Sequence, residues 1–95
     1  MGGKKGILSR LAVALDLQDE PFPGLPLIEI VGTDRLLLEH HMGVIKYDDN
    51  EICVRVKYGV VYVMGFHLVI SKMSRDQLII SGVIAGIKLE RIDRQ

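Results

Sequence analysis

The three histidines and the one cysteine of this chain are its best candidates for metal binding or nucleophilic chemistry. His40 and His41 are adjacent, and neighbouring residues of a strand point to opposite faces, so they could hold one ion together only across a bulge. His67 and Cys53 would have to converge on them from distant turns. The spacing favours solvated or turn-stabilising histidines, and we predict no metal ligands.

Cys53 has the sequence neighbours of an ordinary strand cysteine. Alternation predicts a half-buried strand in which Ile52, Val54 and Val56 share the inward face. Cys53 then shares the other face, which we expect to be exposed, with Arg55 and Lys57. Nearby bases can lower the pKa of a thiol, but a nucleophilic cysteine also needs a base held beside it, and no histidine lies close in sequence. A single cysteine also cannot form an internal disulfide, which favours a cytoplasmic protein.

The acidic and glycine-containing motifs indicate turns. Asp48, Asp49 and Glu51 surround Asn50 without the spacing of a calcium loop, and such residues bond their own backbone in hairpins. No glycine opens a helix in a phosphate-binding pattern. We therefore expect no catalytic residue and no cofactor, and we predict that the chain is not an enzyme.

Short apolar runs separated by turn signals, usually a glycine, fill most of the chain. This punctuation is typical of a compact all-β domain. The runs are 27–31, 36–40, 44–47, 52–56, 60–64, 68–70, 78–80 and 83–89.

The sequence predicts a mainly β protein, in which a short N-terminal amphipathic helix precedes a small antiparallel meander that forms a sandwich or roll. An Sm-like barrel and a short β-solenoid are the alternatives. The polar segment 71–77 is the longest break, where we expect the chain to change sheets or add a helical turn. The predicted parts are a basic segment with the helix (1–19), a Pro-rich connector (20–26) and the all-β domain (27–92).

The amino-terminal segment combines bases with a helical apolar pattern, because apolar residues recur at spacings of three and four through residues 7–17. Such a helix could lie weakly on anionic lipid, bind a partner or pack on the sheet. No charge-free run approaches the roughly 20 apolar residues of a membrane-spanning helix, and we expect no signal peptide. The candidate membrane or partner residues are Lys4, Lys5, Ile7, Leu8, Arg10 and Leu11.

The run 60–64 is apolar on both strand faces. A strand of this kind needs cover from the helix or from a second subunit. We therefore predict self-association through a surface that includes Val60, Tyr62 and Met64, the alternative being that helix and sheet cover both faces.

Overall charge gives no support for a nucleic-acid partner. Twelve acids balance twelve bases, so no net field draws the chain to a polyanion. Two Phe and three Tyr also offer few stacking platforms. An apolar fraction of 48% with 25% charged residues is that of a folded domain. A small RNA-binding barrel of the Sm-like type remains the alternative function.

The middle of the chain has a distinctive set of turn and strand residues, namely the turn Glu39, His40, His41, Met42 and Gly43, then Val44, Tyr47, Ile52, Gly59, Val63-Met64-Gly65, Leu68-Val69-Ile70, Ile80-Ser81-Gly82-Val83-Ile84 and Ile87. This set resembles the YabP/YqfC family of sporulation proteins. The similarity covers residues 25–92, and the basic start, short helix and Leu25-Pro26 resemble the YqfC type. The family more often reads Glu-Asn-His where this chain has His40, and asparagine tolerates left-handed backbone conformations well.

The resemblance implies a non-catalytic structural or assembly factor that is required for endospore formation in a Firmicute. It implies production in the mother cell and a cytoplasmic location, with a peripheral position at the forespore membrane. The expected partners are proteins, namely further copies of the chain and a YqfD-like sporulation membrane protein. It carries over no catalytic, metal or cofactor residue.

Overall fold

The computed structural model describes residues 24–92. Within this range the protein is mainly β and has no helix, so the predicted fold class is confirmed at that level. The expected helix within residues 7–17, the basic segment 1–19 and all but the end of the connector 20–26 lie outside the described residues.

Six strands form one sheet in the order β1-β2-β6-β5-β4-β3, and every neighbouring pair is antiparallel. Antiparallel pairing throughout distinguishes the sheet from the stacked parallel coils of a β-solenoid. The strands are β1 (Leu27–Val31), β2 (Arg35–Glu39), β3 (Val44–Tyr47), β4 (Glu51–Val56), β5 (Gly59–Met73) and β6 (Gln77–Arg91).

One connection departs from a simple meander. β2 is followed in sequence by β3, but it pairs with the first part of β6, whereas β3 pairs with β4 at the opposite edge of the sheet. The long β5–β6 hairpin makes this order possible, because its two ends offer separate strands for pairing: β6 takes β2, and β5 takes β4.

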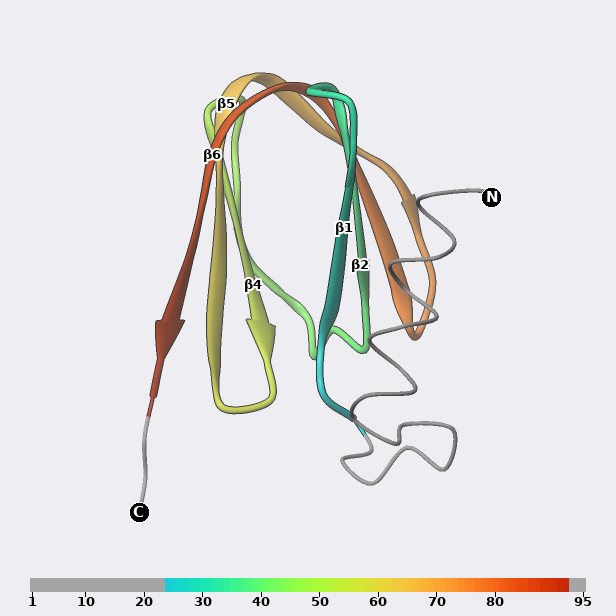
Figure 1. Ribbon diagram of the computed structural model, residues 1–95, viewed down its shortest axis with the longest axis vertical. Helices are drawn as coiled ribbons and strands as arrows, with labels where there is room; N and C mark the ends of the chain where they lie inside the picture. Colours follow the sequence, from blue (N-terminus) through green and yellow to red (C-terminus); the bar gives the residue numbers. More distant parts are fainter. Residues whose placement is uncertain (1–23, 93–95) are drawn as a thin grey trace, which may run out of the picture.

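Both long strands bend. The β5–β6 register shifts between Met64 and Gly65, between Phe66 and Val69, and between Ile70 and Lys72. Such bulges increase local twist and bend a strand. Figure 1 shows the result: β5 and β6 arch over together, so the sheet doubles back and its two halves face each other.

Two pairs of predicted runs are therefore single strands. Runs 60–64 and 68–70 both belong to β5, and runs 78–80 and 83–89 both belong to β6. The glycines between them mark close backbone approach: a Cβ at Gly65 would collide with the Val83 carbonyl, and one at Gly82 would meet the His67 carbonyl. Glycine inside a strand often marks a bulge or a site where another backbone approaches closely.

The expectation for segment 71–77 was wrong. The chain makes a tight hairpin turn there, in which the Ser74 amide donates to the Gln77 carbonyl at 2.7 Å and the Ser74 hydroxyl accepts from the Gln77 amide at 3.0 Å. β5, which precedes the turn, pairs directly with β6, which follows it, so the chain neither changes sheets nor adds a helical turn. The polar side chains of the segment serve the turn itself.

The core lies between the two halves of the sheet. The predicted inward face of β4 is confirmed, since Ile52, Val54 and Val56 are buried. They pack with buried residues of β2, β5 and β6, which are Leu36, Leu38, Val61, Val63, Leu68, Leu78 and Ile80. Burial of this aliphatic layer is the main term that stabilises so small a sheet.

Candidate interaction surface

The turn Glu39–Gly43 bridges the two halves of the folded sheet. On one side, the His40 amide donates to the Asp76 carbonyl at 2.7 Å. On the other, the Met42 amide donates to the Arg55 carbonyl at 2.7 Å, and Gly43 accepts from the Arg55 amide at 2.8 Å. The turn thus ties the β5–β6 hairpin to β4.

Both ring nitrogens of His41 contact the backbone. Nε2 lies 2.7 Å from the Ser74 carbonyl oxygen, and Nδ1 accepts from the Gly43 amide at 3.2 Å. Because a carbonyl can only accept and an amide can only donate, these two contacts match the tautomer with its proton on Nε2. His41 is therefore engaged as a turn-stabilising residue, one of the two roles favoured from the sequence.

His40 adopts the left-handed conformation, with φ of 67°. This is the position at which the resembling family more often has asparagine, which enters that region readily. Gly43 closes the turn with φ of 116°, a conformation that a side chain would strain. The family-like turn is thus defined by its backbone geometry. The Glu39 carboxylate adds one side-chain contact by accepting from Gln77 Nε2 at 3.0 Å.

Cys53 lies on the outward side of β4, as alternation requires, but it is only 5% exposed, so the expectation of an exposed thiol was wrong. Its β-ladder neighbours Lys46 and Tyr62 flank it on both sides. Burial raises the pKa of the Cys53 thiol, and the nearby Glu51 carboxylate adds to this. The thiolate is disfavoured, which makes the residue a poor nucleophile.

The acidic turn 48–51 is a capped hairpin. The Asp48 carboxylate accepts the Asn50 amide at 2.9 Å and the Glu51 amide at 2.8 Å, and these bonds hold the pKa of Asp48 below its ordinary value. Lys46 donates to Glu51 at 2.9 Å, which raises the pKa of Lys46. These contacts match the turn predicted from the sequence.

The residues Val60, Tyr62 and Met64 share the outward face of β5. Val60 is only 8% exposed, and Tyr62 and Met64 are half-buried. Over Tyr62 lies the Lys88 ammonium, 5.1 Å from the ring centroid, while the Tyr62 hydroxyl donates to Glu90 at 2.7 Å. That hydrogen bond raises the pKa of Tyr62. Charged side chains of β6 thus cover part of this face.

The β4–β5 turn presents an aromatic ring between two cations. Tyr58 has φ of 71° and is 56% exposed. The Lys57 ammonium lies 5.5 Å and the Arg91 guanidinium carbon 5.8 Å from the ring centroid. Both distances are within the range of cation–π attraction. A left-handed tyrosine held in this way projects from the end of the folded sheet.

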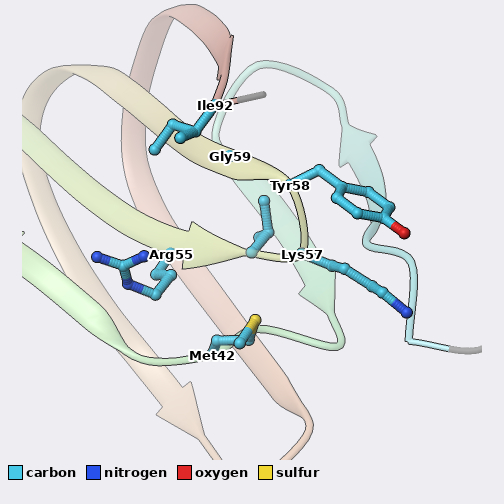
Figure 2. A pocket seen from close by; sticks show the side chains of 7 residues that line it. Met42, Arg55, Lys57, Tyr58, Gly59 and Ile92 are labelled. Atoms are coloured by element: carbon cyan, nitrogen blue, oxygen red, sulfur yellow. The ribbon is translucent and has the colours of Figure 1, made fainter. Parts of the chain in front are cut away.

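A shallow hollow of about 320 Å³ lies beside this turn. In Figure 2 the Lys57 and Tyr58 side chains extend to one side of the turn, and Arg55 lies on the other. We name this region the Tyr58 surface, and it consists of Met42, Arg55, Val56, Lys57, Tyr58, Gly59 and Ile92.

A second hollow of about 260 Å³ shares Lys57 and Tyr58 and adds Arg91. Among the described residues that line the two hollows, three are basic and none is acidic. Exposed apolar side chains, including Met42 and Ile92, line the first hollow together with Arg55 and Lys57. The combination suits an acidic ligand that also carries apolar groups.

The sequence did not single out this surface. Its residues come from the β2–β3 turn, from the β4–β5 hairpin around its turn and from the position just after β6, which are far apart in the chain. The local signal is Lys57-Tyr58-Gly59, a stretch that ends in glycine and is typical of a turn, and it carries no information about which distant residues lie beside it.

The described residues, 24–92, contain neither a cluster of metal-ligating side chains nor a membrane-spanning helix. No three His, Cys, Asp or Glu side chains in this range gather as a metal site would require. In the same range no helix is long and apolar enough to cross a membrane. The candidate helix residues lie outside the described range and remain a prediction, namely Lys4, Lys5, Ile7, Leu8, Arg10 and Leu11.

Comparison with known proteins agrees with the resemblance noted in the sequence. One similar protein is the uncharacterized protein YqfC of Bacillus subtilis (strain 168), which is 27% identical over 89 residues, or 93% of this chain and 96% of the relative. No solved structure matches the chain. The family model named YabP family matches residues 26–95, which include every described strand, and the chain therefore belongs to the YabP family.

Proposed function

We propose that this protein is a non-catalytic assembly factor required for endospore formation in a Firmicute. It acts in the mother cell, in the cytoplasm and at the forespore membrane. It binds further copies of itself and a sporulation membrane protein of the YqfD-like kind.

The observation that carries this proposal is family membership over nearly the whole described chain. Support also comes from similarity to YqfC, which extends over 96% of that relative. The resemblance seen in the turn Glu39–Gly43 implies the sporulation role, and the left-handed His40 supports the match, because the asparagine more common there suits the same conformation.

The contacts of the candidate chemical residues support binding rather than catalysis. Both nitrogens of His41 are engaged with backbone groups, and burial raises the pKa of the Cys53 thiol. A histidine whose nitrogens are both engaged cannot readily act as a general base, and a thiol with a raised pKa does not readily form a reactive thiolate.

The Tyr58 surface is the proposed contact for the partner protein. Arg55 and Lys57 supply positive charge, Met42 and Ile92 supply apolar area, and Tyr58 offers a rigid amphipathic ring of the type enriched at binding hot spots. Charge complementarity selects an acidic segment of the partner as the ligand.

Deletion of the gene in its own host tests the sporulation role. The expected result is a loss of heat-resistant spores with normal vegetative growth, restored by the wild-type chain supplied under a mother-cell promoter. Normal numbers of heat-resistant spores in the deletion strain would contradict the proposal.

RNA binding tests the alternative of an Sm-like barrel. A filter-retention assay with single-stranded RNA at low salt is expected to give no affinity beyond that of a neutral control protein. Tight binding that weakens steeply with salt would instead favour the RNA-binding function.

A further inference from the structure

The second half of β6 is an exposed sheet edge. β2 pairs only with residues 77–81 of β6, and the β1–β2 turn reaches slightly further along it, where the Ile84 amide donates to the Thr33 carbonyl at 2.9 Å. Beyond Ile84, β5 is the only strand that pairs with β6 in the described sheet. An edge strand of this length offers its backbone groups to another strand. Within this segment the Leu89 side chain is 61% exposed.

The hydrogen-bonding direction along this edge follows from one contact. The Ile92 amide donates to the Tyr58 carbonyl at 2.8 Å, and the pairing between Gly59 and Met64 continues without a register shift. The backbone amide and carbonyl groups of successive residues in an antiparallel strand point alternately to its two sides. Those of Lys88 and Glu90 therefore point toward β5, as those of Ile92 do. The amide and carbonyl of Leu89 consequently point away from β5, toward the open edge.

The side chains around Leu89 are self-complementary. Lys88 and Glu90 lie on one face of the strand, as their shared contacts with Tyr62 show, and Leu89 lies on the other. In an antiparallel pairing of two copies centred on Leu89, Lys88 of each copy stands opposite Glu90 of the other. This is a non-hydrogen-bonded pair, in which opposite side chains approach most closely.

We propose that two copies of this chain pair through the second half of β6, antiparallel and centred on Leu89. The two Leu89 residues exchange backbone hydrogen bonds across the twofold axis, and two Lys88–Glu90 ion pairs flank them. A lysine alone on an edge strand opposes pairing, whereas Lys88 followed two residues later by Glu90 selects this register. The interface is isologous, as a twofold dimer requires.

The inference rests on the proposed function in that it assigns a surface to the self-association of an assembly factor. It commits to a different surface from the face of Val60, Tyr62 and Met64. That face is partly covered by Lys88 and Glu90 within the same copy.

Sedimentation velocity of the full chain over a concentration series tests the pairing with charge variants. Lys88→Glu places two glutamates opposite each other, and Glu90→Lys places two lysines, so each variant should weaken dimerisation about tenfold. The double variant Lys88→Glu/Glu90→Lys should restore it, and so should a mixture of the two single variants. Lys72→Glu, at the far end of β5, is the matched control.

Leu89→Pro provides a second, independent variant. Proline removes an amide that points to the open edge and makes no bond to β5, so the fold should be retained while dimerisation is lost. Unchanged circular dichroism confirms the fold.

Amide hydrogen exchange separates this pairing from other ways of covering the edge. Protection of the Leu89 amide should rise with protein concentration. Protection of this amide in a sample that sedimentation shows to be monomeric would mean that another segment of the same copy covers the edge, and would overturn the pairing.

A wild-type monomer at millimolar concentration, or a dimer that the charge variants do not change, would also overturn it. A dimer that the charge variants do not change would overturn only this pairing and leave the proposed self-association in place, whereas a monomer would overturn both. The sporulation role is tested separately by the spore count of the deletion strain, which neither result would alter.

Discussion

The His41 ring joins two loops that are far apart in sequence, because its Nε2 lies 2.7 Å from the Ser74 carbonyl oxygen in the β5–β6 hairpin. The same ring accepts from the Gly43 amide. One side chain therefore fixes both the shape of its own turn and the position of that turn against the opposite hairpin.

Loss of this link should destabilise the fold. His41→Ala removes both bonds, and at about 0.5–1.5 kcal/mol for each bond it should lower the free energy of unfolding by about 1–3 kcal/mol. Urea denaturation followed by circular dichroism measures the change. His67→Asn is the control, because His67 is exposed and left-handed and asparagine tolerates that conformation. Equal effects of the two substitutions would contradict the role of His41.

A methyl group at Gly65 should disrupt the bend in β5. It would collide with the Val83 carbonyl, which belongs to the paired backbone and cannot move aside independently. Gly65→Ala should cost about 1–3 kcal/mol of unfolding free energy, as overpacked sites do. Gly86→Ala is the matched control, since the added Cβ would meet only the Met64 methyl at 3.5 Å, an ordinary contact. Equal free energies of unfolding for Gly65→Ala and Gly86→Ala would contradict the close approach of the two strands at Gly65.

Cys53 should react slowly with a thiol reagent such as a disulfide dye. Its raised pKa means that the buried thiol stays neutral at pH values where a free cysteine, with a pKa of about 8.5, begins to ionise. The contribution of the neutral thiol to folding stability is fully present below the pKa of the thiol in the unfolded chain. It is lost as pH rises through the raised pKa of the folded chain. Absorbance at pH 8 measures the rate, and unfolding in urea should accelerate it strongly. A folded-state rate equal to the unfolded rate would contradict the burial.

Asp48 should contribute to the loss of folding stability at low pH. Its pKa is lowered by the Asn50 and Glu51 amides, so the stabilisation exists above the ordinary pKa of about 3.9 and is lost as pH falls through the lowered value. Asp48→Asn keeps an oxygen acceptor but does not titrate. Its urea midpoint should therefore fall less than that of the wild type between pH 5 and pH 2, whereas identical pH profiles would show that the cap contributes nothing.

Local patterns predicted the strands well where a local rule decides them. Alternation placed Ile52, Val54 and Val56 in the core, and the runs 27–31 and 44–47 coincide with β1 and β3. The same rule treated Gly65 as the end of a run. A glycine required by a bulge and one required by a turn look alike in sequence, because only the partner strand, here at Val83, distinguishes them.

The long-range features could not be predicted in this way. Alternation correctly placed Cys53 on the outward face, but its burial depends on Lys46 and Tyr62, which β3 and β5 supply. The Tyr58 surface likewise forms only when the β2–β3 turn and the end of β6 reach the β4–β5 turn. These contacts depend on the sheet order, which no local pattern encodes.

Complementation of the deletion strain with a charge-reversed Tyr58 surface tests the central claim most directly, through the number of heat-resistant spores. Arg55→Glu/Lys57→Glu should give no more spores than the deletion strain, because the surface would then repel an acidic partner. Lys72→Glu/Arg75→Glu, an equal charge reversal at the β5–β6 hairpin, should restore sporulation to the wild-type level. Urea denaturation of the purified variants should show that both are folded. Full sporulation with Arg55→Glu/Lys57→Glu would contradict the claim that this surface binds the partner.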